Sequence, residues 1–201
     1  MEIELIMSKD FKAEKKEGTV LFCDIRNFTN LFEAEDPMEA VKFANSVLAE
    51  LGQVVEELGG TVDRFTGDGF LAHFGIKNES SHHVLDACNA AINMRDVLKQ
   101  INNQRYYKVQ SVVSTGTSIH TGTVAYGEIK TAHINQRTVL GDVVNTAARI
   151  ESLTKYFSVD ILLSEQSYQH VKEEFQLQEM PLKELQGKQR EVTTYWLLPM
   201  N

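Results

Sequence analysis

The sequence predicts an α+β fold with a mostly antiparallel sheet and helices packed on one face of it. Two observations predict this class. Segments with strand and helix patterns follow one another in the order strand–helix–hairpin–helix–strand–strand–helix–strand, and a hairpin joins two of the strands, which makes them antiparallel. The closest simple description is a ferredoxin-like βαββαβ core. A length of 201 residues suffices for one such domain.

The first strand and the first long helix have the clearest patterns. The run from Gly18 to Ile25 is mostly apolar and predicts a buried central strand. Residues 36–60 predict an amphipathic helix in which Asp36 is the N-cap and Pro37 occupies the first turn. The glycine pair at 59–60 ends that helix.

The remaining elements follow from β-prone runs, turn residues and helical periodicity. Asp142 is the predicted N-cap of the helix that follows it. The predicted elements are hairpin strands at 61–66 and 70–75, a helix at 82–102, strands near 109–120 and 124–129, a helix at 141–156, a strand at 158–164, a helix at 165–175 and a strand at 190–198.

Composition limits the classes of function. A net charge of −8 argues against nucleic acid as a partner, although bound metal ions can still supply local positive charge for a nucleotide. The two cysteines, Cys23 and Cys88, favour a reducing compartment over a disulfide scaffold. No apolar run approaches about 18 residues, and residues 1–17, an expected extension before a domain at 18–201, lack a signal-peptide core. We therefore expect a cytoplasmic chain without membrane insertion.

Two carboxylates stand at the ends of predicted strands. Asp24 closes the first strand, and Asp68 lies at the tip of the hairpin turn. If these strands pair, both carboxylates reach one edge of the sheet, where they can hold a pair of Mg²⁺ or Mn²⁺ ions for phosphoryl transfer. The alternative is a strand-ending aspartate beside an ordinary turn aspartate.

Further groups suit a nucleoside triphosphate. The backbone N–H groups of residues 27–29 open a short helix, and a helix N-terminus can cradle phosphates; the alternative is a capped start with Phe28 in the core. Asn145 and Arg149 are four residues apart and share a helix face. A guanidinium there can spread phosphoryl charge and an amide can fix a ribose oxygen, unless the arginine simply pairs with Glu151.

Together these pieces resemble the catalytic domain of class III nucleotidyl cyclases, the adenylate and guanylate cyclase family, in its bacterial form. The matching segments are VLFCDIRNFT, GGTVDRFTGDGFLAHFG, IHTGTVAYGEI and TVLGDVVNTAARIES, in family order and spacing. The resemblance implies a homodimer with active sites at the interface, in which a nucleoside triphosphate becomes a 3′,5′-cyclic nucleotide and pyrophosphate.

The resemblance also implies roles for individual residues. One subunit supplies Asp24, Asp68 and the Ile25 carbonyl as ligands of two Mg²⁺ or Mn²⁺ ions. The other supplies Asn145 to orient the ribose and Arg149 to stabilise the transition state. The implied nucleotide-binding positions are Asn27, Phe28, Thr29, Arg64, Gly67, Thr138 and Lys188.

The positions that read the base depart from the family pattern. Arg64 stands where adenylate-forming members carry Lys, whereas Thr138 is within the bacterial pattern. An arginine fork can meet an adenine ring nitrogen, a guanine O6/N7 pair or a pyrimidine carbonyl, and a threonine hydroxyl excludes no base. Arg64 can also point away into a salt bridge. Near the C-terminus, Gln186 replaces a phosphate-binding lysine, and Lys188 is the candidate substitute.

ATP is the expected substrate, with pyrimidine triphosphates ahead of GTP as alternatives. A UTP or CTP cyclase of a bacterial anti-phage system, which shares this domain, therefore stays open. So does a non-catalytic homologue acting as a regulatory module, although none of the four main site positions is lost. A dinucleotide cyclase is disfavoured because its hairpin carries a second acid that the Thr-Gly-Asp-Gly-Phe turn lacks.

Overall fold

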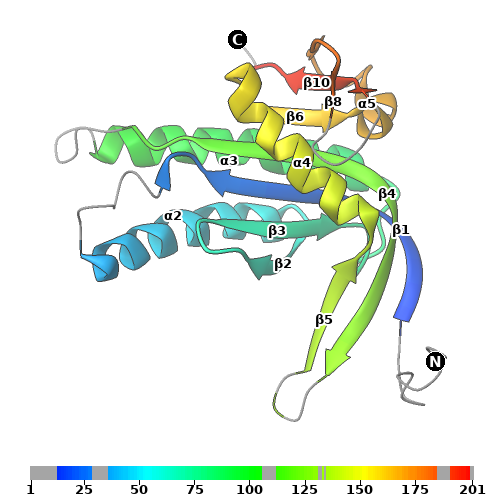
Figure 1. The fold of residues 1–201 in the computed structure, drawn as a ribbon, viewed down its shortest axis with the longest axis horizontal. Coiled ribbons are helices and arrows are strands. Elements are labelled where there is room, and N and C mark those ends of the chain that lie inside the picture. The colour runs from blue at the N-terminus through cyan, green and yellow to red at the C-terminus, as the bar shows by residue number, and fades with distance from the viewer. Residues whose placement is uncertain are drawn as a thin grey trace.

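The computed structural model describes residues 13–28, 36–105, 112–130, 133, 135–184 and 191–199. They form one large sheet with helices against it and a small two-stranded sheet (Figure 1). The strands are β1 (Ala13–Ile25), β2 (Thr61–Phe65), β3 (Gly69–Phe74), β4 (Thr115–Lys130), β5 (Asn135–Leu140), β6 (Ile161–Ser164), β7 (Leu177–Glu179), β8 (Lys183–Glu184), β9 (Glu191–Val192) and β10 (Thr194–Leu197). The helices are α2 (Pro37–Glu57), α3 (His83–Arg105), α4 (Asp142–Phe157) and α5 (Glu165–Val171). None of these helices is long and apolar enough to cross a membrane.

The large sheet has the predicted mostly antiparallel character. Its strands lie in the order β2-β3-β1-β4-β6-β10-β7, and β5 pairs with β4 beside this path. Among the described strands, β4 and β6 run parallel and the other pairings are antiparallel. β1 lies between β3 and β4, so the predicted central strand and the α+β class are both confirmed.

Helices cover both faces of the large sheet, which corrects the prediction of one covered face. α2 and α3 pack on the face that receives Leu21 and Cys23 of β1, and α4 packs on the face that receives Val20 (Figure 1). Successive residues of a strand point to opposite faces. The apolar run in β1 is uninterrupted because both of its faces are covered.

The two predicted helix caps have different outcomes. Asp36 caps α2, since its carboxylate accepts a hydrogen bond of 2.9 Å from the Met38 N–H, and Pro37 is the first helical residue. Asp142 is not a cap: Gly141 occupies the N-cap position with φ +135°, and Asp142 is the first residue of α4. A glycine adopts that positive φ without strain. Asp142 then lies in the first turn, where its negative charge interacts favourably with the helix dipole.

Long-range pairing explains the other differences from the predicted elements. The strand predicted near 124–129 is continuous with the preceding one in β4, because Gly122 does not break the strand. A Cβ at Gly122 would lie 3.0 Å from Val143, so this glycine allows α4 to approach closely. β5, β7 and β8 were not predicted, and the last predicted strand divides into β9 and β10. Residues 109–111 of a predicted strand lie outside the described part.

Candidate active site

The pairing of β1 with β3 brings Asp24 and Asp68 to one edge of the sheet. Asp24 pairs with Gly69, and the Ile25 N–H donates a 2.9 Å hydrogen bond to the carbonyl oxygen of Asp68. A Cβ at Gly69 would lie 2.3 Å from the Cys23 carbonyl oxygen and 2.8 Å from Asp24 Oδ1. The glycine therefore allows the hairpin tip to lie directly against the end of β1.

The electrostatics of this edge favour a bound cation. Burial, followed by the nearby charges of Asp68 and Glu151, raises the pKa of Asp24 to about 7. Burial also raises the pKa of Glu151 to about 7, and the positive charge of Arg26 opposes this rise. Carboxylates that repel one another in a partly buried place suit a hard divalent cation, which would offset their charge. The donor set thus fits Mg²⁺ or Mn²⁺.

Ile25 can take part only through its backbone. Its side chain is buried in the core between the sheet and the helices α2 and α3. The predicted use of its carbonyl oxygen as a metal ligand therefore requires no movement of the side chain.

The turn and the loop beside the carboxylates each contain an exposed residue with a positive φ. Gly67, at φ +94°, is exposed in the turn, and Asn27, at φ +56°, is exposed after β1. Phe28 stacks on Phe43 of α2 at 6.4 Å between ring centroids. Phe28, Phe65 and Gly67 also line a largely apolar cavity of about 360 Å³ against α2. Thr29, the third predicted position of this loop, lies outside the described residues.

Asn145 and Arg149 lie on the side of α4 turned away from these carboxylates. The charge of Glu151 raises the pKa of Asp24, and the charge of Asp68 raises the pKa of Glu151, so Glu151 lies on the side of α4 that faces both aspartates. Arg149, two positions before Glu151, points about 200° around the helix axis from it, and Asn145, six positions before, points about 240° around. Asn145 is accordingly exposed and Arg149 is half-buried, and no ion pair joins Arg149 to Glu151 in the described part of the chain.

Arg64 and Thr138 do come together, although 74 residues separate them. Arg64 Nη1 donates a hydrogen bond of 2.5 Å to Thr138 Oγ1 across β2 and β5. Arg64 also forms an ion pair with Asp63 at 2.8 Å, so the alternative of a salt bridge is present beside the contact with Thr138. Sequence reasoning missed Asp63; an acid inside a short β-prone run was the available clue. Lys188 lies outside the described residues.

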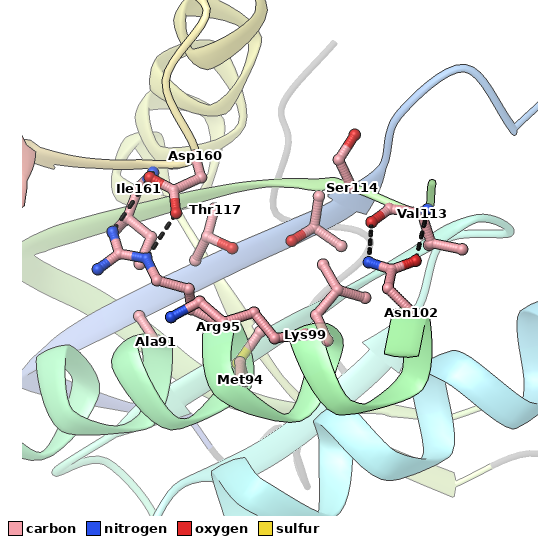
Figure 2. A pocket seen from close by; sticks show the side chains of 12 residues that line it. Ala91, Met94, Arg95, Lys99, Asn102, Val113, Ser114, Thr117, Asp160 and Ile161 are labelled. Carbon is pink, nitrogen blue, oxygen red and sulfur yellow. Dashed lines mark hydrogen bonds and ion pairs between the residues drawn. The ribbon is translucent and has the colours of Figure 1, made fainter. Parts of the chain in front are cut away.

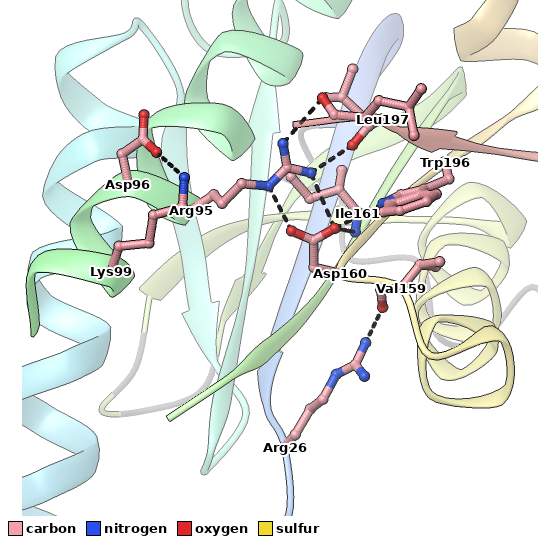
Figure 3. A network of polar contacts seen from close by, with 10 residues as sticks. Arg26, Arg95, Asp96, Lys99, Val159, Asp160, Ile161, Trp196 and Leu197 are labelled. Carbon is pink, nitrogen blue, oxygen red and sulfur yellow. Dashed lines mark hydrogen bonds and ion pairs between the residues drawn. The ribbon is translucent and has the colours of Figure 1, made fainter. Parts of the chain in front are cut away.

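Arg26 is a second residue that sequence reasoning missed. Its guanidinium donates a hydrogen bond to the carbonyl oxygen of Val159, at the turn between α4 and β6 (Figure 3). The next residue, Asp160, accepts from Arg95 Nε at 2.6 Å and from Trp196 Nε1 at 2.9 Å. This network connects the loop after β1 to α3 and to the C-terminal strand, which restrains the loop that follows the carboxylate Asp24.

A separate cavity of about 190 Å³ lies between α3 and the sheet (Figure 2). Asn102 closes one end by bonding both the N–H and the carbonyl of Val113 at 2.8 Å, and Arg95 with Asp160 closes the other. None of the predicted site residues lines this cavity. It therefore does not belong to the candidate active site.

Known proteins are similar to this chain in both sequence and fold. The family model described as the adenylate and guanylate cyclase catalytic domain matches residues 11–199. An adenylate cyclase of Anabaena cylindrica is 38% identical over 76% of this chain, and adenylate cyclase 1 of Rhizobium meliloti is 30% identical over 76%. These matches span 30% and 23% of the two relatives, so the chain corresponds to about a third of such proteins or less.

Solved structures agree with the sequence comparison. The adenylyl cyclase CyaB of P. aeruginosa has a TM-score of 0.86 at 26% identity, with 94% of this chain and 97% of that chain covered. The guanylyl cyclase Cya2 has a TM-score of 0.83 at 26% identity, with 92% and 93% covered. The two structures are named for different bases, so the fold does not select a base. The chain belongs to the adenylate and guanylate cyclase catalytic domain family, the class III nucleotidyl cyclases.

Proposed function

We propose that residues 18–201 form a metal-dependent cyclase that converts a nucleoside triphosphate, ATP first, into its 3′,5′-cyclic nucleotide and pyrophosphate. One observation carries the proposal: Asp24 and Asp68 meet at the β1–β3 edge, where the pKa of Asp24 rises to about 7. In the reaction, the 3′-oxygen forms a bond to the α-phosphorus, the bond to pyrophosphate breaks, and the 3′-hydroxyl proton is released.

The residues of this chain divide into two sets. Asp24, Asp68 and the Ile25 carbonyl would hold two Mg²⁺ or Mn²⁺ ions, and such ions polarise phosphoryl oxygens and lower the pKa of a bound hydroxyl. Asn145 would orient the ribose, and Arg149 would stabilise the charge that develops on the phosphoryl oxygens.

The two sets would meet in a homodimer. Within one chain, Asn145 and Arg149 lie on the side of α4 turned away from Asp24 and Asp68. A second copy related by twofold symmetry supplies the missing set to each site, and both sites then form at the interface. The exposed apolar side chains Val41 and Phe65, beside the turn at Gly67, are suitable for such an interface.

The names of the relatives support ATP. Both bacterial relatives at 30–38% identity are adenylate cyclases. Arg64 keeps pyrimidine triphosphates as the main alternative, because its donors can meet a base carbonyl. The acidic composition and the two free cysteines support a cytoplasmic enzyme that serves intracellular signalling.

The test is turnover of ATP, GTP, CTP and UTP by the purified chain, separately with Mn²⁺ and Mg²⁺, with products identified by mass spectrometry. We expect cyclic AMP as the main product and its loss in Asp68→Asn. Asp96→Asn is the matched control, because Asp96 is an exposed acid paired only with Lys99 among the described residues. Cyclic UMP or CMP as the main product would replace ATP by a pyrimidine substrate. No product from any triphosphate, with metal and nucleotide still bound, would favour a regulatory module.

A further inference from the structure

We infer that Asp63 is a positioning residue that acts through Arg64, and that Arg64 alone of the Arg64–Thr138 pair meets the substrate base. This inference rests on the proposed function and adds a specificity role for a residue outside the predicted site. Asp63 lies in β2, immediately before Arg64. Its side chain is only 1% exposed, so it cannot itself reach a substrate.

The Asp63 carboxylate is held on both oxygens. Oδ2 accepts hydrogen bonds from Arg64 Nη1 at 2.8 Å and from the Thr138 hydroxyl at 2.6 Å. Oδ1 accepts from the Val139 N–H at 3.1 Å. Asp63 therefore attaches the guanidinium of Arg64 to β5, a strand far away in the sequence. Charge-assisted hydrogen bonds of this kind hold a side chain in one geometry.

A β-bulge explains why a strand residue points this way. The register of β2 on β3 runs from Val62 opposite Ala72 to Arg64 opposite Leu71, which leaves Asp63 as the extra residue. A bulge re-aims one side chain without ending the strand. Here it turns an acid toward β5 and leaves the side chain of Arg64 at 35% exposure.

The hydrogen-bond directions decide what the base meets. A threonine hydroxyl has one proton, and Thr138 donates it to Asp63 while its oxygen accepts from Arg64. Thr138 is also only 2% exposed. Among the described residues, Arg64 Nε and Nη2 have no hydrogen-bond acceptor. The free N–H groups of Arg64 therefore offer donors to a base. They select bases by the acceptors on the base edge, which are a ring nitrogen or a carbonyl oxygen.

Asp63→Asn is the variant that tests this arrangement. The amide oxygen can keep the bond to the Val139 N–H, whereas the amide nitrogen then faces two donors, Arg64 and Thr138. We expect kcat/KM for the preferred triphosphate to fall about tenfold, mainly through KM, and the preference over the other triphosphates to shrink similarly. Asp96→Asn, which alters an exposed acid, should leave both values unchanged.

A double-mutant cycle separates positioning from a general structural effect. In an Arg64→Ala background, Asp63→Asn should cause no further loss of preference, because the group through which Asp63 acts is gone. Thr138→Val should behave in the same way. As a single variant it should reduce the preference about threefold, and in the Arg64→Ala background it should cause no further reduction. An equal loss from Asp63→Asn in both backgrounds would overturn the inference, as would a loss of preference from Thr138→Val that persists without Arg64.

Two further measurements test the inference if Asp63→Asn does not fold or if the wild-type chain is inactive. If Asp63→Asn does not fold, as judged by circular dichroism, Thr138→Val carries the same cycle. If the wild-type chain turns over no triphosphate, the proposed function fails, and the cycle is read instead in dissociation constants for non-hydrolysable ATP, GTP, CTP and UTP analogues by calorimetry. Coupling of Asp63 to Arg64 in these constants supports the inference, and additive effects overturn it.

Discussion

At the scale of single residues, the edge of the sheet around Asp24 concentrates groups whose ionisation differs from that in water. Asp24 and Glu151 both have raised pKa values because they are partly buried beside other acids. His73 shows the opposite shift for a base: burial lowers its pKa to about 4, and Lys77 adds to this while Asp63 opposes it. Its ring lies against Tyr126 at 5.7 Å, inside the face covered by α4.

His73 gives a pH dependence of stability. A base whose pKa is lower in the folded state binds its proton more readily when unfolded, so its contribution is complete above the unfolded pKa near 6.5 and is lost as pH falls toward 4. The loss amounts to about 3 kcal/mol at most. We expect His73→Phe to remove most of that loss in denaturant unfolding at pH 7 and pH 4. Replacing the exposed His82 by Phe should leave the loss of stability between pH 7 and pH 4 unchanged. If His73→Phe shows the same loss as the wild-type chain, the assignment to His73 is contradicted.

At the scale of elements, the site depends on how closely two strands approach. β3 begins at Gly69, whose missing side chain lets the turn lie against the Cys23 carbonyl. The register of β1 on β3 then fixes which residues meet, because a shift by one residue would turn every side chain to the other face. The position of the Asp68 carboxylate is thus a property of the hairpin as a unit.

Gly69→Ala tests that close approach. The added methyl would lie 2.3 Å from a backbone oxygen, so the hairpin must shift, and we expect a loss of about 1–3 kcal/mol in the free energy of unfolding. Activity should fall with it, because Asp68 moves relative to Asp24. Gly59→Ala is the control: it also has a positive φ, +82°, but open space around it. It should cost about 1 kcal/mol and leave activity unchanged. Equal effects on activity would show that the approach of the hairpin is unimportant.

At the scale of the whole molecule, Asn145 and Arg149 lie on a different side of α4 from the one that faces Asp24 and Asp68. Asp24 and Asp68 lie near Glu151 of the same chain's α4, whereas Arg149 lies on another side of that helix. Apolar residues pack on both faces of the sheet, under α2 and α3 on one face and under α4 on the other. Apolar side chains of α4 pack against the sheet, and Asn145 stays exposed.

Complementation tests whether the sites form between chains. Asp68→Asn and Arg149→Ala should each be nearly inactive alone, and arginines that stabilise phosphoryl transfer contribute about 10³–10⁵ to kcat. Mixed after subunit exchange, half of the dimers become heterodimers with one intact site, so activity should recover to about a quarter of wild type. Mixing Arg149→Ala with Asp68→Asn/Arg149→Ala is the control and should give no recovery. No recovery in verified heterodimers would place each site within one chain.

The sequence by itself determined the family motifs, the α+β class, the strand at Gly18–Ile25 and the Asp36 cap. These features depend on short-range patterns, so residues near each other in the chain suffice to predict them. The meeting of Asp24 and Asp68 required the pairing of β1 with β3, which only the structure decided. The roles of the site residues remain predictions for the experiments above.

Only the tertiary structure decided which face of the sheet α4 covers, where β5 pairs, and what Asp63 and Arg26 contact. Asp63 meets Thr138 across 75 residues, and Arg26 meets Val159 across 133. A bulge in β2 and the register of β5 on β4 produce the first contact, and neither leaves a periodic pattern in the sequence. Such contacts arise from packing between distant segments, which local propensities do not encode.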